Sequence, residues 1–140
     1  MKNPNTKDWL IDSLIVVCLT GIAVFLLPLV SAWFVGISLH LGRTLYWVHS
    51  IALGDLLPHI IIGCLLGLVT AWLIRHRTLS VASLPAVLFC IFYGLYFSFG
   101  PEPYSWGQSR RDSVLVCSWL LLIIASLFCA RFILQRRAAS

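Results

Sequence analysis

Charged residues are scarce in this sequence: Lys, Arg, Asp and Glu together make up 11% of its 140 residues. Roughly a quarter of the residues of a soluble globular domain are charged, so the composition excludes an ordinary water-soluble fold. Acidic residues are the rarest, with 5 Asp and Glu against 10 Lys and Arg. The basic excess does not indicate binding to nucleic acid, because these residues fall in short loops and termini, where they set membrane topology.

The sequence also lacks the cysteine spacings of a redox motif or of an extracellular disulfide framework. Its five cysteines, Cys18, Cys64, Cys90, Cys117 and Cys129, all fall within apolar segments and include no C-x-x-C pair. Cysteine in a membrane helix commonly serves as a small apolar side chain. There is no nucleophile elbow and no metal-spacing motif either. We therefore expect no cofactor and rank an enzyme below a non-enzymatic function.

Apolar sequence fills the chain instead, because hydrophobic residues make up 60% of it. A helix needs roughly 18 or more apolar residues to cross about 30 Å of hydrocarbon. We expect such helices over about 10–34, 56–74, 79–99 and 113–134, with outer loops over about 36–55 and 100–112. The predicted fold class is an all-α polytopic membrane protein. It is a compact bundle of four transmembrane helices forming one membrane domain, residues 1–140.

The positions of the basic residues predict the orientation of these spans. One side holds seven of them, Lys2, Lys7, Arg75, Arg77, Arg131, Arg136 and Arg137, and the other side holds Arg43, Arg110 and Arg111. Because Lys and Arg accumulate in cytoplasmic loops, both termini are expected in the cytoplasm. The short loops and this bias favour a bacterial inner membrane as the location.

The first outer loop is unusually apolar for a loop. Between Ile37 and His49 its apolar residues recur near helical spacing. We interpret this stretch as an amphipathic helix lying in the interface of the outer leaflet. A continuation of the first span beyond the membrane is the alternative.

Two residues stand out within the first span. Pro28 is expected to bend the helix, because it removes a backbone donor and crowds the carbonyl of Val24. Asp12 lies close to the inner end of the span, where we expect it at the membrane interface.

A first candidate site opens the second span. Asp55 is placed to act as the N-cap, and Pro58 is tolerated in a first helical turn. Asp55 and His59 are four residues apart and share a helix face. The commoner role of such residues is a capped helix with an interfacial histidine. The functional interpretation is a carboxylate–imidazole pair for proton transfer or substrate binding, since histidine titrates most readily near neutrality.

Other polar residues of the outer side are candidates for a metal site. They are His40, His49, His59 and Glu102. Three histidines and a carboxylate suit zinc or copper where they converge. Their spacing is not a known ligand pattern, so we predict no metal site and keep these four residues as weak candidates.

The arginines of the outer side oppose the general charge bias. Arg43, Arg110 and Arg111 are candidates for binding a lipid phosphate or another anionic headgroup, because guanidinium pairs with phosphate through two parallel hydrogen bonds. The simpler interpretation is local pairing with Asp112 or Glu102.

A stripe of small residues runs along the second span. Gly63, Gly67 and Ala71 are spaced four residues apart, and such a stripe allows a second helix to approach closely. The contact is expected either within this chain or between chains.

The function that these observations favour most is that of a non-enzymatic membrane subunit or interaction protein. An immunity-type protein, which blocks a toxin within the membrane, is included in this class. Its partners would be the lipid bilayer and either another membrane protein or further copies of the chain, with no nucleic acid. One alternative is a small oligomeric transporter or lipid-translocating protein for an anionic substrate. The other is a membrane enzyme that uses Asp55 and His59 on a lipid-linked substrate.

Overall fold

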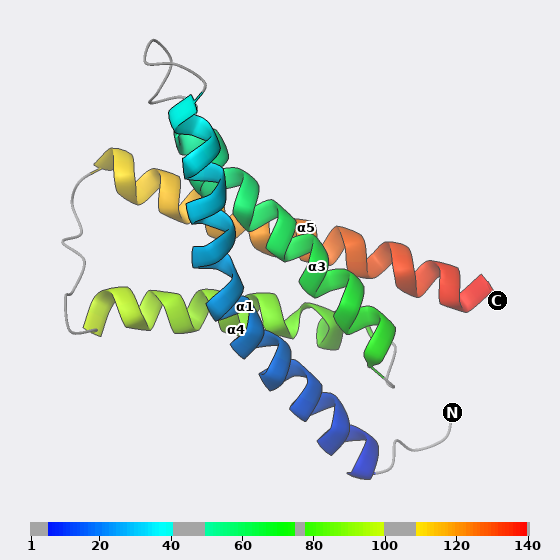
Figure 1. Cartoon of the computed structure of the whole chain (residues 1–140). Helices are drawn as coiled ribbons and strands as arrows, with labels where there is room; N and C mark the ends of the chain where they lie inside the picture. The colour runs from blue at the N-terminus through cyan, green and yellow to red at the C-terminus, as the bar shows by residue number, and fades with distance from the viewer. Residues whose placement is uncertain (1–5, 41–49, 75–77, 100–108, 140) are drawn as a thin grey trace.

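The computed structural model describes residues 6–40, 50–74, 78–99 and 109–139, and helices make up nearly all of these ranges (Figure 1). The elements are α1 (Thr6–His40), the π-helical segment η2 (Ser50–Leu56), α3 (Leu57–Leu73), α4 (Leu79–Phe99) and α5 (Ser109–Ala139). Four helical segments are long and apolar enough to cross a membrane: α1, α3 with the end of η2, α4 and α5. The expected all-helical fold with four such helices is confirmed, and it indicates an integral membrane protein.

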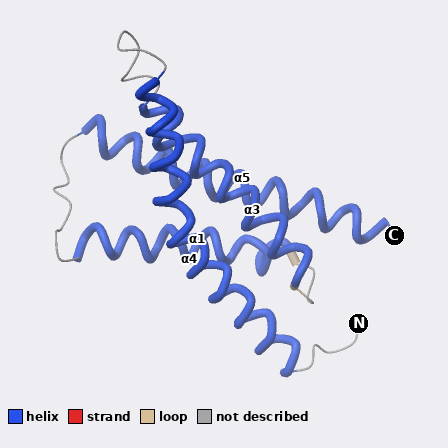
Figure 2. Tube along the Cα trace, in the orientation of Figure 1, coloured by secondary structure: helices blue, strands red, loops and turns tan. Residues whose placement is uncertain are grey.

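The helices alternate in direction, so that α3 and α5 run the same way (Figure 1). The start of α1 and the end of α5 lie at one end of the molecule, where α3 also passes into α4. The helices cross near their middle parts and their ends diverge (Figure 2). This arrangement is more open than the compact bundle expected from the sequence.

The first helix is longer than the span expected from hydropathy. It has 35 residues, which gives a length of about 52 Å at 1.5 Å per residue. It therefore passes the expected end of the first span and continues to His40 within the first outer loop. The rest of the expected amphipathic helix, from residue 41 to His49, lies outside the described residues. Pro28 is inside α1, and the helix is bent rather than straight (Figure 2).

Two clusters of buried apolar side chains hold the helices together. The cluster at the crossing consists of Ala23, Leu27, Ile62, Leu66, Ala86, Phe89 and Leu122. The cluster toward the end that holds both termini consists of Val16, Ala71, Ile74, Val81, Ala82 and Ala130. Alanine is frequent in both, because small side chains allow helices to pack closely where the bilayer supplies no hydrophobic driving force.

Candidate functional site

The junction between η2 and α3 carries the first candidate site. Pro58 lies in the first turn of α3, where it has no N–H to donate and where its ring presses on the carbonyl four residues earlier, that of Gly54. A π-helical turn widens the backbone at this point, and η2 ends directly before α3. Gly54 is itself buried, and a Cβ there would lie 3.0 Å from Cγ2 of Val35, so η2 packs closely on α1.

Asp55 is not the N-cap of α3, which corrects the sequence-based expectation. The residue at the N-cap position is Leu56, which has helical backbone angles and makes no side-chain cap hydrogen bond. Because η2 leads into α3 without a break, the backbone is already helical at Asp55. A capping role needs a non-helical residue at the helix start, and the chain has none here.

His59 is 7% exposed, and its Nδ1–H donates a short hydrogen bond to the backbone carbonyl of Asp55. Asp55 itself is exposed. The two residues do meet on one face, as their spacing predicts, but this hydrogen bond uses the peptide and not the carboxylate. A buried histidine that satisfies a carbonyl in a widened turn has a clear structural role.

The small-residue stripe of α3 lies directly against α5. A Cβ on Gly63 would collide with the carbonyl oxygen of Leu122, and one on Gly67 would collide with that of Ser126. Ala71 belongs to the same buried cluster as Ala130. The partner of the stripe is therefore α5 of the same chain. Because α5 occupies that surface, copies of this chain would have to assemble through another face.

The end of α5 also caps α3. Nη1 of Arg137 donates hydrogen bonds to the carbonyl oxygens of Ala71, at 2.8 Å, and of Trp72, at 3.0 Å. The last carbonyls of a helix lack partners within it and carry partial negative charge, so an arginine there is favourable on both counts. Arg137, one of the basic residues that predict the orientation of the spans, therefore also joins α5 to α3.

Asp12 is the polar residue whose position the sequence least anticipates. It is 1% exposed, on the face of α1 that packs on the other helices. The face is marked by Val16, Ala23 and Leu27, which are also buried. Asp12 lies one helical turn before Val16, so it falls on the same face as these buried residues. This helical spacing is the sequence signal from which its burial could have been predicted.

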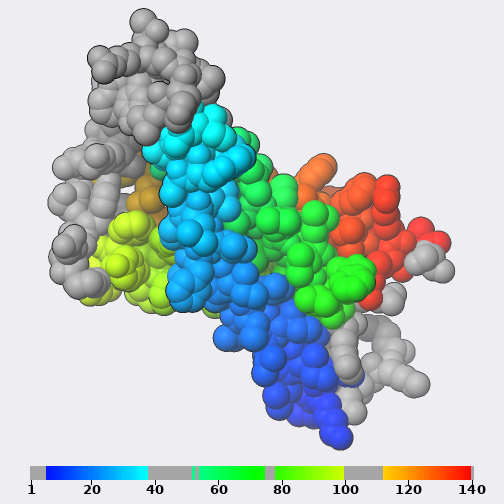
Figure 3. Space-filling view, in the orientation of Figure 1, coloured from blue at the N-terminus to red at the C-terminus, as the bar shows by residue number. Residues whose placement is uncertain are grey.

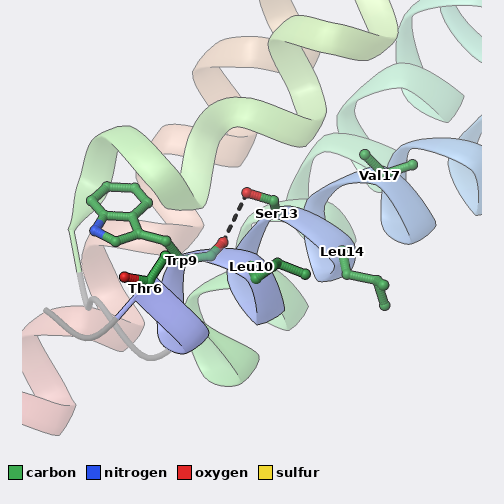
Figure 4. A pocket seen from close by; sticks show the side chains of 6 residues that line it. All are labelled: Thr6, Trp9, Leu10, Ser13, Leu14 and Val17. Carbon is green, nitrogen blue, oxygen red and sulfur yellow. Dashed lines mark hydrogen bonds between the residues drawn. The ribbon is translucent and has the colours of Figure 1, made fainter.

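The opposite face of α1 is open. A shallow groove is lined only by residues of this helix, namely Thr6, Trp9, Leu10, Ser13, Leu14 and Val17 (Figure 4). The Ser13 hydroxyl donates to the carbonyl oxygen of Trp9 at 2.8 Å, so it is satisfied within the helix. A Cβ placed on Gly21 or on Gly36 would meet no atom within 4 Å. A side chain at Gly21 would therefore extend into open space.

The structure does not describe the side chains of the remaining candidate residues. Arg43, His49 and Glu102 lie outside the described residues, as do the side chains of His40, Arg110 and Arg111. Across the described ranges, no group of three or more His, Cys, Asp or Glu side chains is placed to hold a metal ion. The anion-binding and metal-binding hypotheses stay sequence-based predictions.

Comparisons with known protein families, with curated proteins and with solved structures gave no match to this chain.

Proposed function

We propose that the chain is a non-enzymatic membrane subunit that binds another membrane protein through the outward face of α1. The partner is a transmembrane helix of that second protein. The observation that carries the proposal is the contrast between the two faces of α1: one is packed on the bundle, and the other is open, with free space where a Cβ at Gly21 would stand.

Burial is the first support. Only 17% of the most apolar stretch of α1 is buried, against 44% of the corresponding stretch of α3. In the space-filling view α1 crosses one face of the molecule, and its N-terminal part extends past the other helices (Figure 3). The helix is thus attached along one narrow side and presents the rest to the membrane.

The glycines are the second support. Of those in the described structure, Gly54, Gly63 and Gly67 are each in tight contact with another helix, and Gly94 lies beside the ring of Trp119. Each therefore serves a contact that a larger side chain would alter.

Gly21 and Gly36 are different, because nothing lies within 4 Å of a Cβ at either. Glycine costs about 0.5–1 kcal/mol relative to alanine inside a helix. Small residues on a membrane helix allow a second helix to approach. A contact with a helix outside this chain accounts for them on the same physical basis.

Site-specific photocrosslinking in intact membranes tests the proposal. A benzophenone amino acid is placed at Leu14, which is 61% exposed on the open face of α1, and in a matched protein at Ile124, which is 59% exposed on α5. We expect Leu14 to yield one crosslinked membrane protein and Ile124 to yield lipid adducts. Equal products from both positions, or lipid alone from Leu14, would contradict the proposal. A crosslinked product of twice the chain mass would show that the partner is a second copy of this chain and not a different protein.

A pair of glycine variants separates binding from folding. Gly21→Leu places a side chain in open space, so we expect the chain to fold normally and to lose at least 10-fold of its crosslinking at Leu14, which corresponds to about 1.4 kcal/mol. Gly67→Leu should instead reduce the yield of folded protein, because it collides with α5. Unchanged crosslinking in Gly21→Leu would contradict binding at this face.

The two alternatives keep their own tests. An enzyme that uses Asp55 and His59 would lose activity on a lipid-linked substrate in His59→Ala, whereas a subunit would keep its partner. A transporter for an anionic substrate would lose binding when Arg43 and Arg110 are both replaced by Ala. An immunity protein is one form of the proposed subunit, in which the partner is a membrane-inserted toxin.

A further inference from the structure

The exposed side of α5 ends on three polar side chains, those of Arg131, Gln135 and Arg136. Within the described ranges, neither of these arginines is paired with a carboxylate. Arg136 instead contacts Phe132, with its guanidinium carbon 4.5 Å from the centre of the ring. Arg137 differs from both, because it donates hydrogen bonds to the carbonyl groups at the end of α3. Two of the three arginines in this part of α5 therefore have charges that the packing of the helices does not use.

An apolar stripe, formed by Leu120, Ile124 and Phe128, leads along α5 to these residues. The three side chains are each more than half exposed, and they recur every four residues on one side of the helix. Arg131 and Gln135 continue the same side. From Leu120 to Arg131 the helix rises about 16 Å, which is close to half of the roughly 30 Å hydrocarbon core. The apolar stripe therefore has the length of one leaflet, and the charges begin where that leaflet ends.

The two arginines can reach the same depth from opposite directions. Arg136 lies one turn beyond Phe132, and its side chain turns back over that ring toward the apolar stripe. Arg131 is at the end of the stripe, and an arginine near the end of a span can extend its guanidinium toward the polar interface. Gln135 lies between them on the helix surface and adds an amide donor.

We propose that this surface binds an anionic phospholipid, whose phosphate is held by Arg131 and Arg136 and whose acyl chain lies along the apolar stripe. The inference does not rest on the proposed partner of α1. Guanidinium matches phosphate in charge and in the geometry of its hydrogen bonds. The one acidic residue in the sequence of α5 is Asp112, which lies in the first turn, so the helix carries no carboxylate near this end.

The apolar stripe favours a lipid over a free anion. A free phosphate ion would meet only exposed side chains, where salt screens the attraction. A phospholipid is held by the bilayer at the depth where the stripe ends, so its phosphate has a high effective concentration beside the two arginines. A zwitterionic headgroup also carries a cation, which the arginines repel. The surface is therefore expected to select an anionic lipid.

Native mass spectrometry of the full chain tests the proposal. The protein is reconstituted with equal amounts of phosphatidylglycerol and phosphatidylcholine that have the same acyl chains, and is then transferred to a mild detergent. We expect the parent chain to retain phosphatidylglycerol, and the double variant Arg131→Gln/Arg136→Gln to retain roughly 10-fold less, because two charge contacts are lost. Equal retention of the two lipids by the parent chain would overturn the proposal. Displacement of the lipid by millimolar inorganic phosphate would do so as well, because the surface would then bind a free anion.

A control of matched charge separates a site from general attraction. Lys7 is exposed near the start of α1, at the same end of the molecule as the end of α5 (Figure 1). Lys7→Gln removes one positive charge, as Arg131→Gln and Arg136→Gln each do, but it should leave the retained lipid unchanged. An equal loss of lipid in all three variants would contradict a site on α5. The two arginine side chains are exposed, so these variants are expected to fold, which the yield of monodisperse protein checks.

Discussion

At the scale of single residues, His59 shows how far spacing alone reaches. The separation of four residues predicts that Asp55 and His59 share a face, and they do meet. Spacing does not show that the ring bonds to the peptide carbonyl of Asp55, because that contact depends on the π-helical turn next to Pro58. A sequence pattern identifies neighbours, whereas the backbone geometry decides which of their atoms bond.

This contact predicts how His59 responds to substitution. His59→Leu fills the buried position with an apolar side chain but leaves the carbonyl of Asp55 without the ring N–H, so we expect a loss of about 1 kcal/mol in the free energy of unfolding. His59→Asn places an amide N–H near the position of Nδ1 and should recover much of that loss. Denaturation in mixed micelles with increasing dodecyl sulfate measures both. Equal stability of His59→Leu and the parent chain would show that the hydrogen bond is not stabilising.

At the scale of elements, the glycine stripe illustrates which part of a helix contact can be predicted. Gly63, Gly67 and Ala71 mark a surface for close packing from their spacing alone. The helix that covers it cannot be predicted, because a stripe of small residues fits a helix of the same chain and one of another chain equally well. The carbonyl groups of Leu122 and Ser126 identify α5 as the partner, and that contact depends on the arrangement of the whole chain.

The same element predicts opposite effects for two alanine substitutions. Gly67→Ala adds a Cβ that collides with the carbonyl of Ser126, so α3 and α5 must move apart. We therefore expect the free energy of unfolding to fall by about 1–3 kcal/mol. Gly21→Ala adds the same methyl group in open space and should raise the free energy of unfolding by about 0.5–1 kcal/mol through helix propensity. The dodecyl sulfate titration compares them directly. A change of the same sign in both variants would contradict the difference in packing.

At the scale of the whole molecule, the number of spans follows from the sequence because the length and hydropathy of each segment must match the bilayer. The expected third span, 79–99, has the bounds of α4. The open crossing of the helices and the burial of Asp12 do not follow, because they depend on which faces pack together. Hydropathy describes the contact of a helix with lipid and carries little information about its neighbours.

Orientation in the membrane gives the last prediction. The start of α1 and the end of α5 lie at the same end of the molecule, and the basic residues Lys7, Arg136 and Arg137 are near it (Figure 1). Since Lys and Arg stay on the cytoplasmic side, green fluorescent protein fused to either terminus should fluoresce in a bacterial host. Alkaline phosphatase fused within 100–112 should be active, because that loop would face the periplasm. Termini on opposite sides would contradict an even number of spans, whereas both termini in the periplasm would keep the fold and reverse the orientation that the arginines predict.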